Sequence, residues 1–510
     1  MLAKMNSACV LGIDAYKVVV EVDIANGIPS FSIGGLPDTA IRESKDRIRS
    51  AIKNSGFDFP TKRITVNLAP ADIKKEGAGF DLPIAVAILA AINVLETEKF
   101  KEYIICGELS LNGEVKSIKG ALPIALSFSK TGENKILFPF ENIQEAGIVN
   151  EADIYPIHNL KETVDFLNGR IELKPQKINA AKLFKKNSKY RFDFSDVKGQ
   201  EHVKRGLEIA AAGSHNVLLI GPPGAGKSML AKRLATILSD MSIEESLETS
   251  KIHSVAGLLS AKKGLIATRP FRSPHHTISD CALTGGGTYP SPGEISLAHN
   301  GVLFLDELPE FKRNVLEVMR QPLEDQTITI SRVAGTLTYP ARFMLIAAMN
   351  PCPCGFFTDP KKECRCTPTQ IQKYLSKISG PLLDRIDIHL EVPRLNYEQL
   401  TKKAAAETSS QIKERVDKAR GIQKQRYRKD GFSFNAFLES KEMEKYCRIN
   451  SEGQELLKMA ILELGLSARA YDKVLKVSRT IADLDGKETI EASHISEAIG
   501  YRSLDRNLWV

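Results

Sequence analysis

The chain has 510 residues, enough for about three domains at roughly 150 residues each, so a single core is not expected. Its 43% hydrophobic and 26% charged residues are typical of an ordinary globular protein and exclude a disordered or fibrous one. Lys and Arg outnumber Asp and Glu by 70 to 62, and the resulting charge of +8 fits nucleic acid, an acidic partner or neither.

Neither a membrane span nor a secretory leader is apparent. The longest apolar run, residues 82–95, is shorter than the roughly 18–20 residues that span a bilayer. The N-terminus alternates polar and apolar side chains, without the basic stretch, apolar core and cleavage site of a signal peptide. Eight cysteines are too few for a disulfide scaffold of this length. We therefore expect a cytoplasmic protein with no membrane partner.

Residues 1–170 mix short strands with helices. Residues 39–54 and 82–95 have the apolar content of helices. Strand-like runs alternate with these helices, at residues 17–24, 64–68, 103–108 and 135–138. The mixture predicts an α+β or α/β domain.

The rest of the chain divides by composition into three segments. Residues 171–191 predict a basic, solvated linker, because residues 174–191 contain seven basic residues, no acidic one and little apolar periodicity. Residues 192–395 predict a second α/β domain. Residues 396–510 are charged, have apolar residues at helical spacing, and predict an all-helical domain. The charge of the linker either serves solubility alone or meets a partner.

A phosphate-binding motif lies in the second α/β domain. The apolar strand 216–220 leads into a glycine-rich loop and then a helix, the context that the motif G-x-x-x-x-G-K-[ST] requires. Its residues are Gly221, Pro222, Pro223, Gly224, Ala225, Gly226, Lys227 and Ser228. The glycines let backbone N–H groups surround the phosphates, Lys227 reaches the outer phosphates and Ser228 binds Mg²⁺. The motif predicts ATP and Mg²⁺ as cofactors.

Two further apolar strands end in polar residues. Residues 301–305 are followed by Asp306 and Glu307, and residues 343–349 by Asn350. A carboxylate at such a position completes the magnesium site, and the next polarises the attacking water, which indicates a hydrolase. Asn350 would orient that water. Because parallel strands end at the same edge of a sheet, the three strand ends are expected to converge.

Two arginines are candidates for stabilising phosphate charge in the transition state. Arg385 follows the third strand among apolar neighbours, and Arg469 opens a helix near the C-terminus. Arginine is always charged and serves this role from the same chain or from a neighbouring one. Taken alone, either residue is more typical of a salt-bridged helix position.

These residues together resemble the AAA+ ATPases of the magnesium-chelatase-like branch, and nearly the whole chain resembles the YifB/ComM family of competence-associated DNA helicases. The sequence segments that carry the resemblance are residues 270–287, 292–311, 347–355 and 379–387. The resemblance implies an α/β multidomain chain with a central P-loop AAA+ core and a C-terminal helical lid.

The resemblance also assigns roles to residues. It implies that Asp306 and Glu307 form the Walker B pair, that Asn350 is sensor 1, and that Arg469 is sensor 2. It makes Arg385 a finger donated to a neighbour's site. A finger supplied by a neighbour implies a ring, normally a homo-hexamer.

In this branch two insertions point into the pore of the ring, and one is a β-hairpin before sensor 1. Residues 327–339 alternate like two strands around a turn that contains Gly335, and Arg332 lies at its tip. We expect DNA phosphate contacts at Arg332, Lys262, Lys263 and Arg269. The alternative for the hairpin is a solvated surface feature.

A histidine pair follows Arg269 in the chain. His275 and His276 suggest a metal site, but adjacent histidines usually face apart, which favours a structural role.

The N-terminal domain is similar to the proteolytic domain of Lon, which has a ribosomal S5 domain 2-like fold. Gly79 stands in the place of that family's serine nucleophile, and the counterpart of its lysine falls near Leu122. Neither nucleophile nor base is present, so covalent catalysis is not available. The resemblance therefore implies a non-proteolytic scaffold or interaction module.

Four cysteines cluster in the segment 352–366. Cys352, Cys354, Cys364 and Cys366 follow the pattern C-x-C-x9-C-x-C. Four thiolates suit a tetrahedral Zn²⁺ site, although this spacing is tighter than the usual C-x2-C. The alternative is four reduced thiols.

The leading hypothesis is an ATP-hydrolysing hexameric motor acting on single-stranded or branched DNA, with helicase activity that promotes branch migration in homologous recombination or natural transformation. The alternatives are a chelatase motor subunit and an ATP-regulated DNA-binding scaffold without helicase activity. A protease is opposed by Gly79 and Leu122. Most of the positive charge lies in residues 174–191 and 402–430, so the remainder is slightly acidic, and this concentration favours nucleic acid as the partner.

Overall fold

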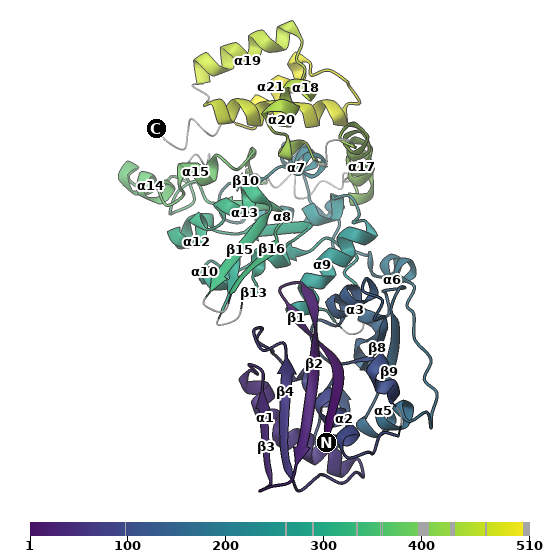
Figure 1. The fold of residues 1–510 in the computed structure, drawn as a ribbon. Coiled ribbons are helices and arrows are strands. Elements are labelled where there is room, and N and C mark those ends of the chain that lie inside the picture. Colours follow the sequence, from purple (N-terminus) through teal and green to yellow (C-terminus); the bar gives the residue numbers. More distant parts are fainter. Residues whose placement is uncertain are drawn as a thin grey trace. The chain divides into compact units, whose positions relative to one another are not determined.

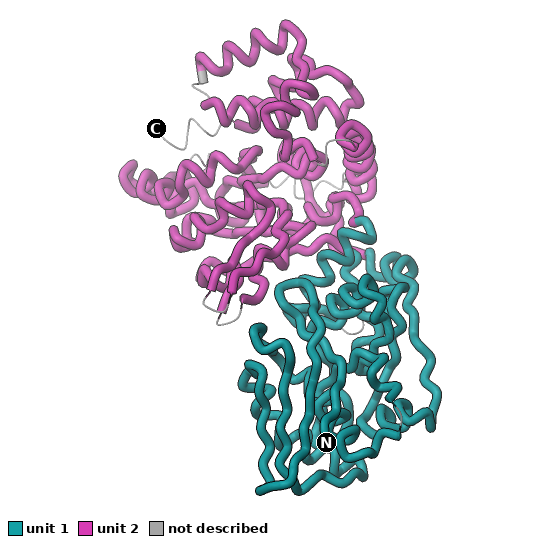
Figure 2. The backbone as a smooth tube through the Cα atoms, viewed as in Figure 1, with its two compact units in different colours: residues 1–188, 242–267 teal, residues 189–241, 268–510 magenta. Residues whose placement is uncertain are grey.

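The computed structural model describes residues 1–96, 98–260, 263–287, 290–332, 335–357, 359, 361–395, 407–428, 434–464 and 467–502. The chain divides into two compact units, as Figure 2 shows. The first contains residues 1–188 together with 242–267, and the second contains residues 189–241 and 268–510. The composition had placed 242–267 inside the nucleotide-binding domain, whereas the structure groups this segment with the first unit.

A seven-stranded mixed sheet forms the centre of the first unit (Figure 1). β1 pairs antiparallel with β2 and β2 with β4, while β3, β5, β8 and β9 make parallel pairs with their neighbours. In sheet order the strands are β3 (Ser30–Gly34), β4 (Arg63–Ala69), β2 (Asp14–Ala25), β1 (Leu2–Leu11), β5 (Ile104–Ile105), β8 (Lys135–Pro139) and β9 (Asp153–Ile157). A short pair, β6 (Glu108–Leu109) and β7 (Val115–Lys116), lies outside this sheet.

The predicted helices of the first unit are confirmed. α1 covers the predicted range, and α2 ends four residues before the end of the apolar run 82–95. Ten of the eleven residues of α2 are buried, which explains why its sequence is apolar on every side. The helices are α1 (Thr39–Asn54), α2 (Asp81–Ala91), α3 (Ala121–Ser129), α4 (Ile143–Ala146), α5 (Leu160–Leu167), α6 (Ala180–Asn187) and α9 (Ile243–Val255).

Polar contacts attach α9 to the first unit. The Ser254 hydroxyl donates to the buried Glu145 carboxylate, and the Gly120 N–H donates to the Ser254 carbonyl over 3.3 Å. Lys251 pairs with Asp14 at 2.7 Å. These contacts are between residues more than 100 positions apart, so the sequence pattern could not reveal them.

The segment expected to be an irregular linker contains a helix. α6 begins after Asn179, whose side chain accepts a hydrogen bond from the Lys182 N–H. Leu183 is buried against Ile148 and Leu265. The basic residues made this helix look like solvated chain, but Leu183, helped by Ala180 and Phe184 of the same helix, packs against an apolar cluster, and the cap completes the docking of two helical turns.

The second unit is built on a five-stranded sheet in which every pair is parallel. The central strands are buried throughout, so they read as continuous apolar runs. In sheet order they are β11 (Phe271–Arg272), β14 (Gly301–Leu305), β17 (Phe343–Met349), β10 (Val217–Ile220) and β18 (Ile388–Glu391). This mixed α/β chain with a parallel-sheet core confirms the coarse fold prediction.

Helices and two strand pairs surround this sheet (Figure 1). The strand pairs are β12 (Gly285–Gly286) with β13 (Ser291–Pro292) and β15 (Thr327–Arg332) with β16 (Gly335–Pro340). The helices as far as residue 383 are α7 (Glu201–Gly213), α8 (Lys227–Ile237), α10 (Asp280–Thr284), α11 (Glu294–Leu297), α12 (Arg313–Glu317), α13 (Arg320–Asp325), α14 (Pro368–Leu375) and α15 (Gly380–Leu383).

The C-terminal helices share one apolar core with the sheet of the second unit. They are α17 (Ser409–Arg426), α18 (Ser440–Tyr446), α19 (Ser451–Leu464), α20 (Ala468–Leu484) and α21 (Ala492–Gly500). α17 and α20 both pack against α7. The predicted division at residues 395 and 396 stays a prediction.

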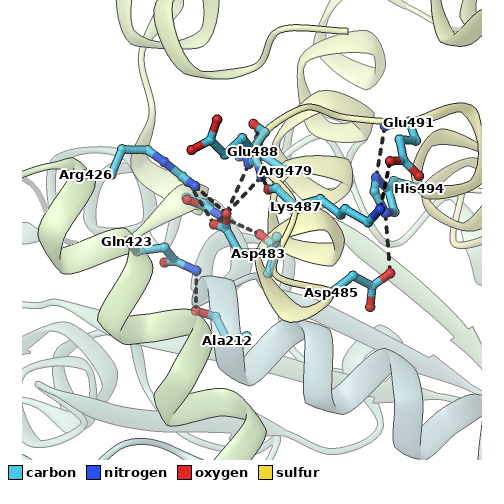
Figure 3. Close-up of polar contacts among 12 residues, drawn as sticks. Ala212, Gln423, Arg426, Arg479, Asp483, Asp485, Lys487, Glu488, Glu491 and His494 are labelled. Carbon is cyan, nitrogen blue, oxygen red and sulfur yellow. Dashed lines mark hydrogen bonds and ion pairs between the residues drawn. The ribbon is translucent and has the colours of Figure 1, made fainter. Parts of the chain in front are cut away.

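A buried ion network fixes these helices to one another (Figure 3). Arg426 of α17 and Arg479 of α20 both donate to the Asp483 carboxylate, at distances of 2.5–3.2 Å. Gln423 donates to the Ala212 carbonyl at 3.1 Å and so connects α17 to α7. A charge buried with its partners holds one packing arrangement, because separating it from them leaves a buried charge uncompensated.

Within the described residues, none of the helices has both the length and the apolar character that a bilayer crossing requires.

Candidate functional site

Three neighbouring strands end at one edge of the five-stranded sheet. β17 lies between β14 and β10, and the register places Ile220 beside Met349. The residues that follow open onto a cavity of about 380 Å³ lined by residues 223–229, 306–307 and 349–350. Open parallel sheets bind ligands at this edge. The cavity is therefore the candidate nucleotide site, and the predicted convergence of the three strand ends is confirmed.

The loop at the end of β10 has a backbone conformation that only glycine adopts readily. Gly224 and Gly226 have φ angles of 78° and 93°, in the left-handed region. Gly226 is followed directly by α8, which begins at Lys227. The N–H groups of the first turn of a helix have no carbonyl partner within it and are available to phosphate oxygens. The loop is thus shaped to hold an anion.

Lys227 is buried beneath this loop. Its ammonium donates to the Gly221 carbonyl at 2.6 Å, to the Pro222 carbonyl at 3.1 Å and to the Asn350 side-chain oxygen at 3.1 Å. Burial lowers the pKa of Lys227, and the nearby carboxylates of Asp306 and Glu307 oppose that shift. The structure therefore brings the predicted lysine and the predicted sensor residue into direct contact.

Ser228 and Asp306 form the oxygen-rich part of the cavity. The Ser228 hydroxyl donates to the Asp306 carboxylate over 2.6 Å. Hydroxyl and carboxylate oxygens are the ligands that Mg²⁺ prefers, with phosphate and water completing its octahedron. The two side chains therefore fit the predicted magnesium site.

Glu307 has a strained backbone at the end of β14. Its φ and ψ are 55° and 48°, the left-handed region that residues with a side chain rarely occupy. Its side chain is 57% exposed and lines the cavity. Such strain persists where surrounding structure enforces it and is concentrated at functional sites. The carboxylate is accessible to water, as the proposed role in hydrolysis requires.

His276, for which the sequence favoured a structural role, lies beside the nucleotide cavity and contacts Glu307. Its Nδ1 lies 3.3 Å from the Glu307 carboxylate, and its ring also meets Phe311 edge-on. The expectation that the two histidines face apart is wrong, because the rings of His275 and His276 lie only 4.1 Å apart between centroids. His276 and Glu307 are 31 positions apart, with several short helices and strands between them, so no periodic signal could predict the contact.

Gln200 also escaped prediction. It is buried before α7, and its side-chain amide donates to the Ala225 carbonyl at 2.8 Å and to the Pro393 carbonyl at 3.1 Å. It therefore holds the phosphate loop against the segment after β18. Only its position in the fold reveals this role, since a glutamine before a helix is common.

The two arginines lie away from this cavity. Neither is among the described residues that line it. Arg385 donates to the Pro381 carbonyl and to the Glu324 carboxylate, and its side chain is only 12% exposed. Arg469 lies in the first turn of α20, where it pairs with Asp384 at 2.9 Å. Their roles as finger and sensor remain predictions.

The predicted hairpin is confirmed as a pair of strands. β15 and β16 pair antiparallel with Arg332 opposite Gly335, and residues 333–334 of the tip lie outside the described part of the chain. Arg332 is exposed and donates to the Cys281 sulfur at 3.3 Å. Its guanidinium is accessible to a ligand.

The other basic residues expected to bind DNA differ in their surroundings. Lys263 is exposed. Lys262 lies outside the described residues. Arg269 is engaged by protein, because its guanidinium donates to the carbonyls of Ser239 and Asn300 at 2.6 and 2.8 Å and contacts that of Asp240. An arginine that satisfies backbone carbonyls in this way serves the fold, so the structure argues against Arg269 as a phosphate contact.

The four clustered cysteines come together after β17. The sulfur atoms of Cys352, Cys354, Cys364 and Cys366 all lie within 4.8 Å of one another. All four are free thiols in this structure.

Comparisons with known proteins agree with these motifs. Three family models match: "Magnesium chelatase, subunit ChlI" over residues 193–400, "Subunit ChlI of Mg-chelatase" over residues 20–142, and "Magnesium chelatase, subunit ChlI C-terminal" over residues 406–502.

Several relatives are similar along the whole chain. YifB of Escherichia coli K12 is 46% identical over 509 residues, which cover 99% of this chain and 98% of YifB. The competence protein ComM of Haemophilus influenzae is 46% identical over 515 residues, with the same coverage of 99% and 98%. The magnesium-chelatase 38 kDa subunit of Rhodobacter capsulatus is 24% identical over 31% of this chain and 50% of its own length. The chain therefore belongs to the YifB/ComM family, within the magnesium-chelatase-like AAA+ proteins, which are of ATPase type.

Proposed function

We propose that this protein hydrolyses ATP with Mg²⁺ and uses the energy to move DNA, as a ring-forming motor that promotes branch migration in homologous recombination or natural transformation. The observation that carries the proposal is the meeting of Lys227, Ser228, Asp306, Glu307 and Asn350 at one sheet edge.

Each side chain of the cavity has a defined part in hydrolysis. Lys227 exchanges its carbonyl partners for the outer phosphates of ATP, so that its charge is applied where negative charge accumulates. Ser228 and Asp306 hold Mg²⁺, which neutralises the phosphate oxygens when bound. Glu307 accepts a hydrogen bond from the attacking water and polarises it. Asn350, already beside Lys227, orients that water at the γ-phosphate.

His276 positions the water-activating carboxylate. At 3.3 Å its ring nitrogen restricts the rotation of Glu307, whose exposed side chain would otherwise sample several rotamers. Preorganising a catalytic group removes the cost of ordering it during the reaction.

Assembly into a hexamer is proposed from the arginine placement. Arg385 lies outside its own chain's cavity, and an arginine finger is needed close to the γ-phosphate. A neighbouring chain in a closed ring provides such a finger through a head-to-tail interface. Arg469 of α20 is proposed to serve as the second arginine of the site once nucleotide binding moves the C-terminal helices.

DNA is proposed as the substrate because of the positions of the basic residues and the similarity to a competence protein. Arg332 is an exposed arginine on the hairpin, and basic residues are concentrated in residues 174–191 and 402–430. A relative with 46% identity bears the name competence protein. A chelatase motor is the second candidate because the family models name chelatase subunits, but the chelatase 38 kDa subunit of Rhodobacter capsulatus is only 24% identical over 31% of the chain, against 46% identity over 99% of the chain for ComM.

The first unit is proposed to be a scaffold with a Lon-like fold and no proteolytic activity. Gly79 has no side chain to act as a nucleophile, and Leu122 is completely buried. The unit therefore contributes binding or assembly.

The test is a strand-exchange assay on three-stranded and four-way DNA with the wild type, Glu307→Gln and the control Glu310→Gln. Glu310 is also exposed, lies three residues away and pairs with Lys377 at 3.3 Å outside the cavity. We expect the wild type and Glu310→Gln to move the branch point only with ATP and Mg²⁺, and Glu307→Gln to bind ATP without moving it. Hydrolysis without movement of any branched DNA would favour the chelatase motor or the scaffold.

A further inference from the structure

The loop that follows Asn350 gathers four sulfur atoms at one point. The Cys352 sulfur lies 3.3 Å from that of Cys354 and 3.7 Å from that of Cys364, and Cys354 and Cys364 are 3.6 Å apart. The Cys366 sulfur completes a group whose members all lie within 4.8 Å of one another. Residues 355–363 separate the two C-x-C pairs, so the chain returns to the same point by a tertiary arrangement.

These separations match one particular kind of site. A disulfide would place two of the sulfurs about 2.05 Å apart. A tetrahedral Zn²⁺ site with Zn–S bonds of about 2.3 Å places its sulfurs about 3.8 Å apart. A polynuclear iron–sulfur cluster holds its cysteine sulfurs farther apart, because its own iron and sulfide atoms lie between them. The observed values agree with a single ion.

Backbone N–H groups support the sulfurs. The Phe357 N–H donates to the Cys352 sulfur at 3.3 Å, and the Cys354 N–H donates to the Cys366 sulfur at 3.4 Å. Such donors stabilise the negative charge of metal-bound thiolates and fix their orientation. Gly355 makes the turn between these groups with φ of 82°.

We propose that Cys352, Cys354, Cys364 and Cys366 bind one structural Zn²⁺ ion, and that this ion fixes the loop against the phosphate-binding loop. A site with four thiolates has no open position for substrate, so its role is structural rather than catalytic.

The loop and the phosphate-binding loop are in direct contact. A Cβ added to Gly355 would lie 2.5 Å from Cδ of Pro223, so the backbone of the cysteine loop approaches the Pro223 ring as closely as glycine allows. Arg394 connects the same two loops, because its guanidinium lies over the Phe356 ring at 5.1 Å and reaches the Pro223 carbonyl at 3.4 Å. Cys352 is two positions after Asn350. Loss of the metal should therefore loosen both Pro223 and Asn350.

The first measurement is metal content. The full-length protein, purified without added metal or chelator, is expected to contain about one Zn²⁺ per chain when measured by inductively coupled plasma mass spectrometry. Replacement by Co²⁺ should give the intense visible absorption of a tetrahedral tetrathiolate site. Well under one zinc with four reduced cysteines, or iron in its place, would overturn the assignment.

Two kinds of variant localise the ion. Cys352→Ser and Cys364→Ser should lose zinc, whereas Cys281→Ser and Cys447→Ser, which change cysteines outside the cluster, should keep it. If a cluster variant fails to fold, stepwise release of zinc from the wild type by a mercurial reagent, with one zinc freed as four thiols react, gives the same answer. Zinc retained by both cluster variants would contradict the proposal.

The effect on the nucleotide loop is measured by binding of a fluorescent ATP analogue to zinc-loaded and zinc-depleted protein. This part rests on the proposed function, and depletion is expected to weaken binding about tenfold. Equal affinity in the two forms would disprove the coupling. Since metal content requires no activity, its result is independent of whether the protein hydrolyses ATP.

Discussion

Two loops of this chain each lead into a buried helix, one at residues 75–80 of the first unit and one at residues 221–226 of the second. The second loop delivers Lys227 and Ser228 into a cavity that also receives Asp306 and Asn350. The first delivers only Asp81, whose carboxylate is already held by Arg47 at 3.0 Å and by the Leu109 N–H at 3.3 Å.

The difference shows that a loop before a buried helix does not by itself make an active site. Activity depends on which side chains converge at the loop. In the second unit, neighbouring strands end in polar residues that face a cavity. In the first unit, the Asp81 carboxylate is already hydrogen-bonded within the fold, and Leu122 is packed into the core. The following predictions test that contrast.

Apart from Glu307→Gln, the largest effect is expected for Arg385→Ala. Removing an arginine finger should lower the rate of ATP hydrolysis by about 10³-fold or more. Arg320→Ala is the control, since Arg320 is half-buried like its partner Glu317, with which it pairs at 3.0 Å. The steady-state release of phosphate is the measurement.

A mixture separates a finger acting between chains from one acting within a chain. Arg385→Ala and Lys227→Ala proteins combined in equal amounts should recover part of the activity, because some neighbouring pairs then have both groups intact. A mixture no more active than its components would show that Arg385 does not serve a neighbour's site.

Lys227→Ala should reduce hydrolysis by about 10²–10³-fold, because the phosphates lose their buried cation. Lys232→Ala, an exposed lysine of the same helix, should match the wild type. Both proteins should be compared by phosphate release and by thermal melting. If Lys227→Ala kept most of its activity while folded, the cavity would not be the hydrolytic site.

His276→Ala should lower kcat about tenfold and leave KM nearly unchanged, because the histidine orients Glu307 and does not touch ATP. His276→Asn retains a polar group of similar reach and should recover part of the rate. A change confined to KM would contradict the positioning role.

Asp81→Asn tests the structural role of the first unit's carboxylate. Burial raises the pKa of Asp81 to about 6, above its value of about 3.9 in the unfolded chain. The folded unit therefore loses stability as pH rises towards and through 6, and this one group accounts for about 1 kcal/mol between pH 5 and pH 7. The asparagine does not titrate.

Hydrogen exchange of the α2 amides measures this directly. From pH 5 to pH 7, protection in Asp81→Asn should improve relative to the wild type, after correction for the intrinsic pH dependence of exchange. A difference between the two proteins that does not change with pH would show that Asp81 does not titrate in this range. ATP hydrolysis should stay the same in both.

The smallest effect is expected for Gly79→Ser. A serine alone is expected to have no base to activate it, because Leu122, near which the resemblance to Lon places the lysine, is apolar and buried. The variant should remain inactive against casein and other unfolded proteins and should keep wild-type ATP hydrolysis. Detectable peptide cleavage would show that a base from elsewhere in the unit reaches residue 79.

The sequence predicted the nucleotide cavity well for a physical reason. Strands buried on both faces of a parallel sheet are continuous apolar runs, so β14 and β17 could be delimited to the residue and their terminal side chains identified. The glycines of the phosphate-binding loop were a second signal, because they adopt left-handed backbone angles that let N–H groups surround a phosphate. Polar residues at the ends of neighbouring parallel strands can therefore be predicted to lie close together in the structure.

What the sequence could not predict depended on contacts between irregular segments. The contact between His276 and Glu307 joins a loop to a strand end, and Arg269 is held by carbonyls of distant residues. The helix α6 was hidden by its basic residues. In each case the information lies in tertiary packing, which no periodic pattern records.

The rate of ATP hydrolysis of the full-length protein, measured with and without single-stranded DNA and beside Glu307→Gln, tests most directly whether the protein is a DNA motor. We expect Mg²⁺-dependent hydrolysis that rises when DNA is added and is abolished in Glu307→Gln. Absence of hydrolysis, or hydrolysis that DNA leaves unchanged, would contradict the account of a DNA motor.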